Sequence, residues 1–263
     1  MCIGHEAIAR LTGFSLEGKT NKSLRSSVTK LARLGYRTEH YEPPLSSHIL
    51  HELREVSDEW LATTSGAEMR YSLGAFEDDY VRSTPVVVVR APDGQITAFA
   101  NLVVQEQWRE VAVDLMRRRH EVENGTMDFL FVSIIEWAKA HSYATFDLGL
   151  SALAGVGEDS DDPTVERALH YIYEHIYQFY NFKGLHAFKG KFHPQWVPRY
   201  LVYPGAASLP SVALALIQAD AGMDVTLDNV KGWVRKRLRR DARGGKSARS
   251  EIPQLGEQEQ IAG

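Results

Sequence analysis

The chain has 263 residues, of which 44% are hydrophobic and 24% charged, so its composition is that of a globular protein with one large or two small domains. Its single cysteine, Cys2, excludes a disulfide framework and a cysteine-based metal site, and it indicates a reducing compartment. The net charge of -4 conceals two basic segments: residues 17–37 hold six Lys or Arg and one acid, residues 231–249 hold nine and one, and 15 basic and 32 acidic residues lie elsewhere. This segregation favours polyanionic partners on two surfaces, although solvated charge runs give the same pattern.

The sequence contains no recognisable membrane span or secretory signal. Its longest uninterrupted aliphatic run, Val86 to Val89, is far shorter than the roughly 20 apolar residues that a membrane-spanning helix needs. The N-terminus lacks a positive region followed by an apolar stretch. We therefore expect a cytoplasmic protein, peripheral at most to the inner face of the cell membrane.

The first predicted element is an amphipathic helix over residues 17–35. Leu24, Val28 and Leu31 recur at helical spacing, and a second stripe of the same helix is basic. Gly35 ends it. The elements expected after it are, in chain order, a strand over residues 36–41, a helix over 47–61, a hairpin of 85–90 with 95–104, a strand over 109–115, a helix from 124 to 141, a strand over 144–148, a helix over 164–178 and a final strand over 199–203. This is an α/β order that suits an acyltransferase-like sheet.

The densest cluster of chemically useful side chains is residues 179–200, which we call the aromatic–basic segment. It intersperses three lysines and an arginine among seven aromatic residues, so it could pair phosphates and also stack bases or cover acyl chains. A core edge with solvated lysine tips would have the same composition.

A second cluster lies where the strand over 109–115 ends. Asp114 is followed by Arg117, Arg118 and Arg119, ahead of an apolar helix. Since sites of α/β proteins tend to lie at the carboxyl ends of strands, this carboxylate and these guanidinium groups are candidates for a site. A structural ion pair of Asp114 with Arg117 explains the pattern equally well.

These stretches, with Leu16-Glu-Gly-Lys, Lys22-Ser-Leu-Arg-Ser, Asn124-Gly-Thr-Met-Asp-Phe-Leu-Phe and Phe146-Asp-Leu-Gly, closely resemble the cytosolic domain of the phosphatidylglycerol lysyltransferase family, the aminoacyl-phosphatidylglycerol synthases. The resemblance covers roughly residues 3–205. It implies two fused units of N-acetyltransferase-like fold, each a mixed sheet flanked by helices, joined by a basic helix. It also implies transfer of an amino acid from aminoacyl-tRNA to a lipid hydroxyl, with phosphatidylglycerol as the anionic membrane lipid.

The resemblance divides the chain into three parts. Residues 1–45 would be the end of a first unit and the basic linking helix, residues 46–205 the second, catalytic unit, and residues 206–263 a C-terminal helix with a basic, partly disordered tail. Members of the family usually carry a multi-span membrane region and a complete first unit, whereas this sequence begins near the end of that unit. We expect a separate protein to supply the missing part, or the second unit to act alone, or the chain to be an inactive relative.

The site that we expect centres on Asp114 and Arg117, which would face the aromatic–basic segment in one pocket. Asp114 would orient the lipid hydroxyl or bind the ammonium group of the amino acid. The cations expected at phosphate and at developing negative charge are Lys189, Lys191 and Arg199. The other substrate-binding candidates are Asp128, Asp147, Glu174, Tyr180 and Phe182. The cations expected to meet tRNA are Lys22, Arg25, Lys30, Arg33 and Arg37.

No cofactor and no metal is expected, because the ester of aminoacyl-tRNA is already activated. An acetyl-CoA enzyme is the main alternative within the fold, but the stretch after Arg117 has a single glycine, and Glu121 and Glu123 would repel a pyrophosphate. Residues 225–240 form either an amphipathic basic helix that lies on an anionic membrane or a disordered tail.

Overall fold

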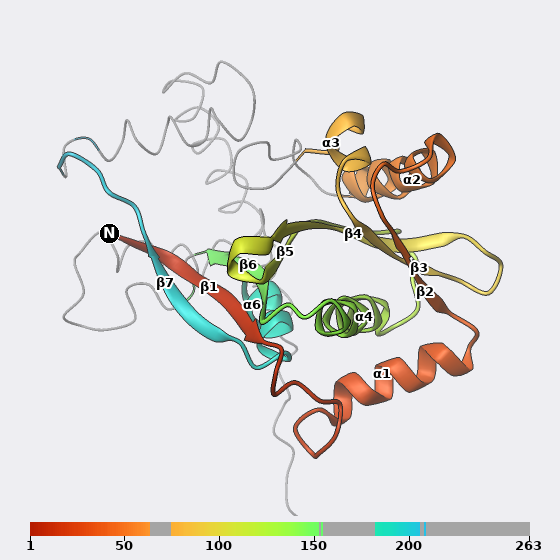
Figure 1. Cartoon of the computed structure of the whole chain (residues 1–263), viewed down its shortest axis with the longest axis horizontal. Coiled ribbons are helices and arrows are strands. Elements are labelled where there is room, and N and C mark those ends of the chain that lie inside the picture. The colour runs from red at the N-terminus through yellow and green to blue at the C-terminus, as the bar shows by residue number, and fades with distance from the viewer. Residues whose placement is uncertain (64–74, 153, 155–181, 206–207, 209–263) are drawn as a thin grey trace, which may run out of the picture.

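The computed structural model describes residues 1–63, 75–152, 154, 182–205 and 208, which build one seven-stranded mixed sheet with helices on both faces (Figure 1). The strands are β1 (Cys2–Arg10), β2 (Arg37–Tyr41), β3 (Val86–Arg90), β4 (Ile96–Gln105), β5 (Glu110–Arg118), β6 (Thr145–Ala152) and β7 (Gln195–Tyr200). They are ordered β2-β3-β4-β5-β6-β1-β7. Within this sheet only β5 and β6 pair in parallel.

The helices divide between the two faces of the sheet. One face carries α1 (Lys22–Arg33), α4 (Thr126–Ala140) and α6 (Phe182–Gly190), and the other carries α2 (Ser47–Thr63) and α3 (Asp78–Arg82) (Figure 1). Each face has its own hydrophobic core: Phe131 of α4 packs with Phe146 on the first, and Leu53 of α2 with Phe99 on the second. A 3-10 turn, η1 (Glu106–Trp108), joins β4 to β5. Among the described helices, none combines the length and the apolarity that a membrane crossing requires.

The predicted α/β fold class, a mixed sheet flanked by helices, is confirmed, and the strands and helices predicted between residues 36 and 148 are found with shifted ends. Four described elements were not predicted. Residues 2–10 form β1, the aromatic–basic segment contains α6, and the short α3 and η1 lie between predicted elements. The final strand begins at Gln195, four residues before its predicted start. The helix predicted over 164–178 and nearly all of the C-terminal part over 206–263 lie outside the described residues.

β1 occupies an interior position of the sheet. It pairs with β6 on one side, from Gly4↔Ala152 to Arg10↔Thr145, and with β7 on the other. β2 pairs with β3 at the opposite edge. Residues 1–45 therefore belong to the same sheet as the segment after them, and the division expected at residue 45 stays a prediction without a matching break in the sheet.

The parallel pairing of β5 with β6 is short, and this positions the candidate site. It runs from Glu110↔Thr145 to Ala112↔Asp147. Beyond this point β5 continues to Arg118 against β4, and β6 continues to Ala152 against β1. The carboxyl-terminal halves of two adjacent parallel strands thus separate, which is where ligand sites of α/β sheets lie.

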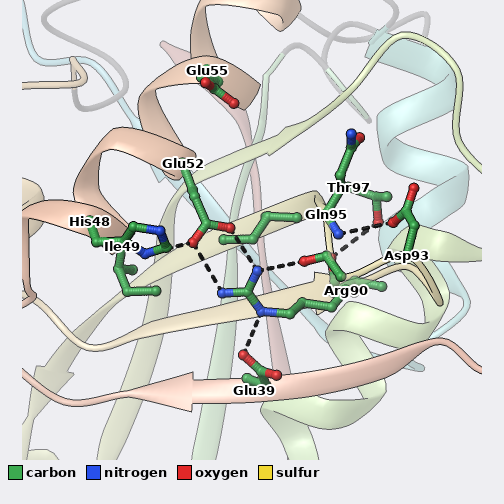
Figure 2. Close-up of polar contacts among 12 residues, drawn as sticks. Glu39, His48, Ile49, Glu52, Glu55, Arg90, Asp93, Gln95 and Thr97 are labelled. Carbon is green, nitrogen blue, oxygen red and sulfur yellow. Dashed lines mark hydrogen bonds and ion pairs between the residues drawn. The ribbon is translucent and has the colours of Figure 1, made fainter.

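A buried arginine ties the edge strand β2 to the rest of this sheet (Figure 2). The Arg90 Nε donates to Glu39 at 2.6 Å, and its Nη1 donates to Glu52 of α2 at 2.7 Å and to the Gly94 carbonyl at 2.7 Å. Its Nη2 donates to the Tyr41 hydroxyl at 2.9 Å. Because the Arg90 side chain is only 9% exposed, these partners replace water around its charge.

Candidate active site

Asp114 lies on β5 where the pairing with β4 is irregular. The register shifts between Ala100 and Leu102 of β4, whose partners on β5 are Met116 and Val113, so β5 has one extra residue there. The Asp114 carboxylate accepts a hydrogen bond from the Tyr80 hydroxyl of α3 at 2.6 Å. Burial, followed by this hydrogen bond, raises the pKa of Tyr80 to about 12, so the phenol stays a proton donor at neutral pH.

Arg117 is buried on the face covered by α2, together with its cross-strand neighbour Phe99. Its guanidinium donates to the Ser57 hydroxyl, lies 5.2 Å from the ring centroid of Trp60 and is 3% exposed. The expectation that Asp114 and Arg117 face the aromatic–basic segment is wrong. Tyr80 of α3 holds Asp114, and strand alternation turns Arg117 to the α2 face, whereas α6 packs on the other face of the sheet. The contacts of Arg117 with Ser57 and Trp60 hold α2 against β5.

Lys189 and Asp147 bring opposite charges to β6. Lys189 reaches the sheet from α6, is 3% exposed, and its ammonium donates to the Leu150 carbonyl at 3.0 Å. Burial lowers the pKa of Lys189 to about 8, against the opposing attraction of Asp147. Burial raises the pKa of Asp147, although the Gly149 amide donates to its carboxylate at 2.7 Å and Lys189 favours its charged form. Asp147 is the last residue of β6 that pairs with β5, and Leu150, which accepts the Lys189 ammonium, lies on the part of β6 beyond this pairing.

The other predicted lysine, Lys191, meets the start of α4. Its ammonium donates to the two carboxylate oxygens of Asp128 at 2.8 and 3.1 Å, and Ser27 of α1 donates to the same carboxylate at 2.9 Å. Asp128 is 5% exposed, so this bridge holds α1, α4 and the end of α6 together. A cavity of about 400 Å³ opens beside it, lined among others by Arg118, His120 and Lys191.

The remaining substrate-binding candidates are not gathered at this place. Arg199 lies on β7 and forms an ion pair with Glu6 of β1. Glu174 and Tyr180 lie outside the described residues, and Phe182 begins α6 with a side chain that is also outside them. Of the predicted residues, the structure brings together Lys191 with Asp128 and Lys189 with Asp147.

The predicted basic stripe is found on α1 and just beyond it. Lys22 and Arg33 are exposed, and a groove of about 550 Å³ on this side of α1 is lined among others by both. Lys30 forms an ion pair with Glu123, and Arg37 forms one with Glu39 at 2.9 Å. Arg25 differs, because it donates to the carbonyls of Leu16 and Gly18 and so holds the loop before α1.

Sequence reasoning missed the polar partners that fix these residues. Tyr80 stands in a short helix without a clear periodic pattern, and nothing in the sequence links it to Asp114. Asn101 did leave a signal, since it is an amide within the apolar run 96–104.

Ser151 and His186 are a further pair that sequence reasoning missed. The Ser151 hydroxyl lies 3.1 Å from the His186 ring nitrogen, and that ring stacks on Trp196. Among the described residues, no cluster of His, Cys, Asp or Glu is suited to a metal.

The site offers the Asp114 carboxylate of β5, which the Tyr80 phenol fixes, and the buried Lys189 ammonium, which contacts β6. Asp114 is approached from the α3 face of the sheet and Lys189 from the α6 face, and both stand beyond the last paired residues of β5 and β6. A carboxylate can orient a hydroxyl or an ammonium group, and a buried cation can stabilise an oxyanion. Such groups suit acyl transfer from an activated ester.

The sequence and the fold match proteins that act on a phospholipid. Residues 1–203 match the family described as phosphatidylglycerol lysyltransferase, C-terminal. The chain is 38% identical over 215 residues to the phosphatidylglycerol lysyltransferase of Bacillus subtilis, covering 82% of this chain and 25% of that protein. It is 35% identical over 207 residues to that of Staphylococcus xylosus, covering 79% and 24%. The chain thus spans about a quarter of the length of these curated relatives.

Two solved structures share the fold. The C-terminal domain of a putative lysylphosphatidylglycerol synthetase from Agrobacterium fabrum superposes with a TM-score of 0.72 at 41% identity, covering 84% of this chain and 66% of that one. L-PGS from Bacillus licheniformis superposes with a TM-score of 0.70 at 32% identity, with the same two coverages. The chain therefore belongs to the phosphatidylglycerol lysyltransferase family, in which it corresponds to the C-terminal region.

Proposed function

We propose that this chain carries the catalytic site of an enzyme that transfers an amino acid, lysine by the name of its relatives, from aminoacyl-tRNA to a hydroxyl of phosphatidylglycerol. Family membership over residues 1–203 supports the reaction class and the lipid. The aminoacyl-tRNA donor rests on the basic surface of α1 and on the need for an activated ester, because Asp114 and Lys189 can position and polarise an ester but supply no energy for making one.

The reaction needs one bond to form and one to break. The lipid hydroxyl oxygen attacks the carbonyl carbon of the aminoacyl ester, the bond from that carbon to the ribose oxygen breaks, and the proton of the hydroxyl passes to the ribose oxygen. Positioning of the two substrates and stabilisation of the oxyanion lower the barrier. This balance requires no metal and no organic cofactor.

The observation that carries the proposal is the buried ammonium of Lys189, which contacts the half of β6 that has separated from β5. A cation that is 3% exposed is costly to bury, and a partner such as the Leu150 carbonyl compensates only part of that cost. An oxyanion formed nearby would complete the compensation in the transition state, which is where stabilisation accelerates a reaction. Asp114, held by Tyr80 on β5, would orient the lipid hydroxyl or the ammonium group of the amino acid.

The other groups would hold the substrates. Asp147, half-buried beside Lys189, would attract the cationic aminoacyl group, and Lys191 with Arg118 beside the 400 Å³ cavity would meet a phosphate. Arg117 would act indirectly, by holding α2 against β5. Glu174, Tyr180, Phe182 and Arg199 stay candidates for the substrate surface.

The partners of this proposal are aminoacyl-tRNA, an anionic phosphatidylglycerol membrane and a protein part that supplies the first unit or the membrane region. Lys22 and Arg33 on α1 would contact the phosphates of tRNA, with Lys30 and Arg37 at the ends of the stripe. The chain would lie at the inner face of the membrane, where both substrates are present.

Transfer of radiolabelled lysine tests the proposal directly. Lysyl-tRNA, phosphatidylglycerol vesicles and the 263-residue chain are incubated, and label is counted in chloroform and in water. We expect label in the chloroform phase, with a loss of roughly 100-fold or more for Asp114→Asn.

Two controls separate the alternatives. Vesicles of phosphatidylcholine test the lipid, and lysine-free tRNA with free lysine tests the ester donor. Label in the aqueous product alone would indicate a non-lipid acceptor. If lysyl-tRNA stays unreacted, and a panel of other charged tRNAs and anionic lipids also gives no labelled product, the result would contradict activity of this chain.

A further inference from the structure

Asn101 is a fully buried amide in an otherwise apolar stretch of β4. It is 0% exposed, and its neighbours Ala100 and Leu102 belong to the core on the α4 face. Burying a primary amide is favourable only when its hydrogen-bonding groups have partners. The partners of Asn101 therefore indicate what the residue does.

The carbonyl oxygen of Asn101 compensates the irregularity of β5. Because β5 has one extra residue between Val113 and Met116, the ladder with β4 is interrupted at Asp114 and Leu115. The Asn101 Oδ1 accepts the Leu115 amide at 2.7 Å. A side chain of β4 thus replaces the backbone acceptor that a regular ladder would supply, and it holds the bulge on which Asp114 stands.

The amide nitrogen of Asn101 acts on the other side of Asp114. It donates to the Thr84 hydroxyl at 3.3 Å, and a hydrogen bond from Asn101 to the Tyr80 oxygen opposes the rise of the Tyr80 pKa. Tyr80 in turn donates to Asp114 at 2.6 Å. Asn101 therefore contacts the backbone next to Asp114 and also the phenol that fixes its carboxylate.

We infer that Asn101 is a positioning residue for acyl transfer: it holds the β5 bulge and the Tyr80 phenol so that the Asp114 carboxylate keeps one orientation. The inference rests on the proposed function of Asp114 and names a residue that sets its geometry. Asn101 itself is 0% exposed, so its side chain is out of reach of a substrate. Its effect should therefore appear in the rate of the chemical step rather than in substrate affinity.

Asn101→Ala is compared with a matched buried change on the same strand. Thr97 is 7% exposed and donates to the Val89 carbonyl at 3.1 Å, so Thr97→Val removes one buried hydrogen bond of β4 without contact with Asp114 or Tyr80. Both variants should lose stability in urea. We expect kcat for lysine transfer to fall roughly 10-fold or more for Asn101→Ala, with KM for lysyl-tRNA changed less than about 3-fold, and to stay within about 2-fold for Thr97→Val.

A crystal structure of Asn101→Ala gives a readout that does not depend on activity, and Asn101→Ser replaces it should the alanine variant not fold. We expect the Tyr80 to Asp114 hydrogen bond to be lost or the Asp114 carboxylate to rotate. An unmoved Asp114, or equal losses of kcat in the Asn101 and Thr97 variants, would overturn the inference. If Asp114→Asn abolishes transfer while Asn101→Ala leaves kcat unchanged, Asn101 has no positioning role and the proposed function stands. If the wild-type chain transfers no lysine, the proposed function fails. The crystal structure of the variant then decides alone whether Asn101 orients Asp114.

Discussion

The Lys189 ammonium is the group whose surroundings most constrain the chemistry. It is buried at the place where β6 leaves β5, with the Leu150 carbonyl as a partner at 3.0 Å and Asp147 as the opposing charge. Its pKa of about 8 means that the charged form prevails at neutral pH and is lost only a little above it. The residue can therefore act as a cation under physiological conditions, within reach of a pH experiment.

Raising the pH should remove this cation. We expect the rate of lysine transfer, corrected for hydrolysis of lysyl-tRNA without enzyme, to fall as pH rises through about 8, and the descending limb to move to higher pH in Lys189→Arg. The effect on stability has the opposite sign. The pKa of Lys189 in the folded chain lies below its ordinary value of 10.5, so the unfolded chain binds more protons between these two values. Lys189 therefore raises the free energy of unfolding as pH rises through that range. A pH profile with the same descending limb in Lys189→Arg would contradict the assignment.

At this scale the sequence predicted several residues but not their contacts. Asp114, Lys189 and Asp147 stand out because charged side chains at strand ends and among aromatic residues are chemically conspicuous. Their neighbours Tyr80, Asn101 and Leu150 come from other elements, and the bulge in β5 that turns Asp114 toward Tyr80 depends on pairing with β4. Such information is tertiary. Arg117 was expected beyond the end of a strand over 109–115, whereas β5 continues to Arg118 and its alternation decides which face Arg117 lies on.

β2 is an edge strand that a buried arginine attaches to the neighbouring elements. Arg90 on β3 joins it to α2 and to the turn at Gly94, by hydrogen bonds from all three guanidinium nitrogens (Figure 2). Glu39 and Glu52 would be two nearby carboxylates without their main partner if Arg90 were removed. The cluster therefore fixes three elements at once.

Arg90→Met should destabilise the fold by about 3 kcal/mol, because removing one member of a buried ion pair leaves the other charges uncompensated. The measurement is urea unfolding followed by tryptophan fluorescence. Arg54→Met is the matched control: Arg54 pairs with Asp78, but both side chains are at least 40% exposed, so the expected cost is below about 1 kcal/mol. Equal costs for the two variants would show that the Arg90 cluster does not hold β2.

Glu39 predicts an acid sensitivity of the same cluster. Burial raises the pKa of Glu39, but hydrogen bonds from Tyr41, Arg90 and Arg37 outweigh it and lower the pKa to about 2. Its stabilisation is therefore fully present above the ordinary value of 4.5 and is lost as pH falls from there toward 2. The urea midpoint should fall less steeply between pH 5 and 3 in Glu39→Gln than in the wild type; parallel curves would exclude Glu39 as a cause.

The elements that sequence reasoning missed share a physical reason. β1 mixes Gly4, His5 and Glu6 with apolar residues, and its pairing partners on β6 and β7 lie more than 130 residues away, so no local pattern identifies it. α6 contains Gly184 and ends at Gly190, both poor helix formers, and only packing of Phe188 on Phe131 explains its place. The helices with regular apolar spacing, α1, α2 and α4, were predicted, although α1 begins at Lys22, five residues after its predicted start.

At the scale of the molecule, the basic face of α1 lies on the same side of the sheet as α6, which brings Lys189 to β6 (Figure 1). The bridge from Ser27 through Asp128 to Lys191 joins α1 to the end of α6. The groove on α1 and the cavity at the start of α4 meet at one ion pair, because Lys30 lines the groove and its partner Glu123 lines the cavity.

Lys22→Gln and Arg33→Gln should weaken binding of lysyl-tRNA and reduce the slope of log K against log salt concentration by about 0.7 to 0.9 for each lost phosphate contact. Fluorescence anisotropy over a range of KCl concentrations measures this slope. Arg54→Gln removes an equal charge from the opposite face and should leave the slope unchanged. Arg25→Gln should reduce stability instead, because Arg25 is engaged with the loop before α1. An unchanged slope in Lys22→Gln and Arg33→Gln would remove α1 from the tRNA surface.

In the proposed reaction Asp114 and Lys189 would act on one ester, Asp114 from the α3 face of the sheet and Lys189 from the α6 face. Single-turnover rates of lysine transfer in the wild type, Asp114→Asn, Lys189→Met and the double variant test it most directly. Groups that act as a unit are strongly non-additive, so we expect the double variant to be no slower than the slower single variant by more than about 3-fold. Losses that multiply in the double variant, or a Lys189→Met variant with the wild-type rate, would contradict a shared site.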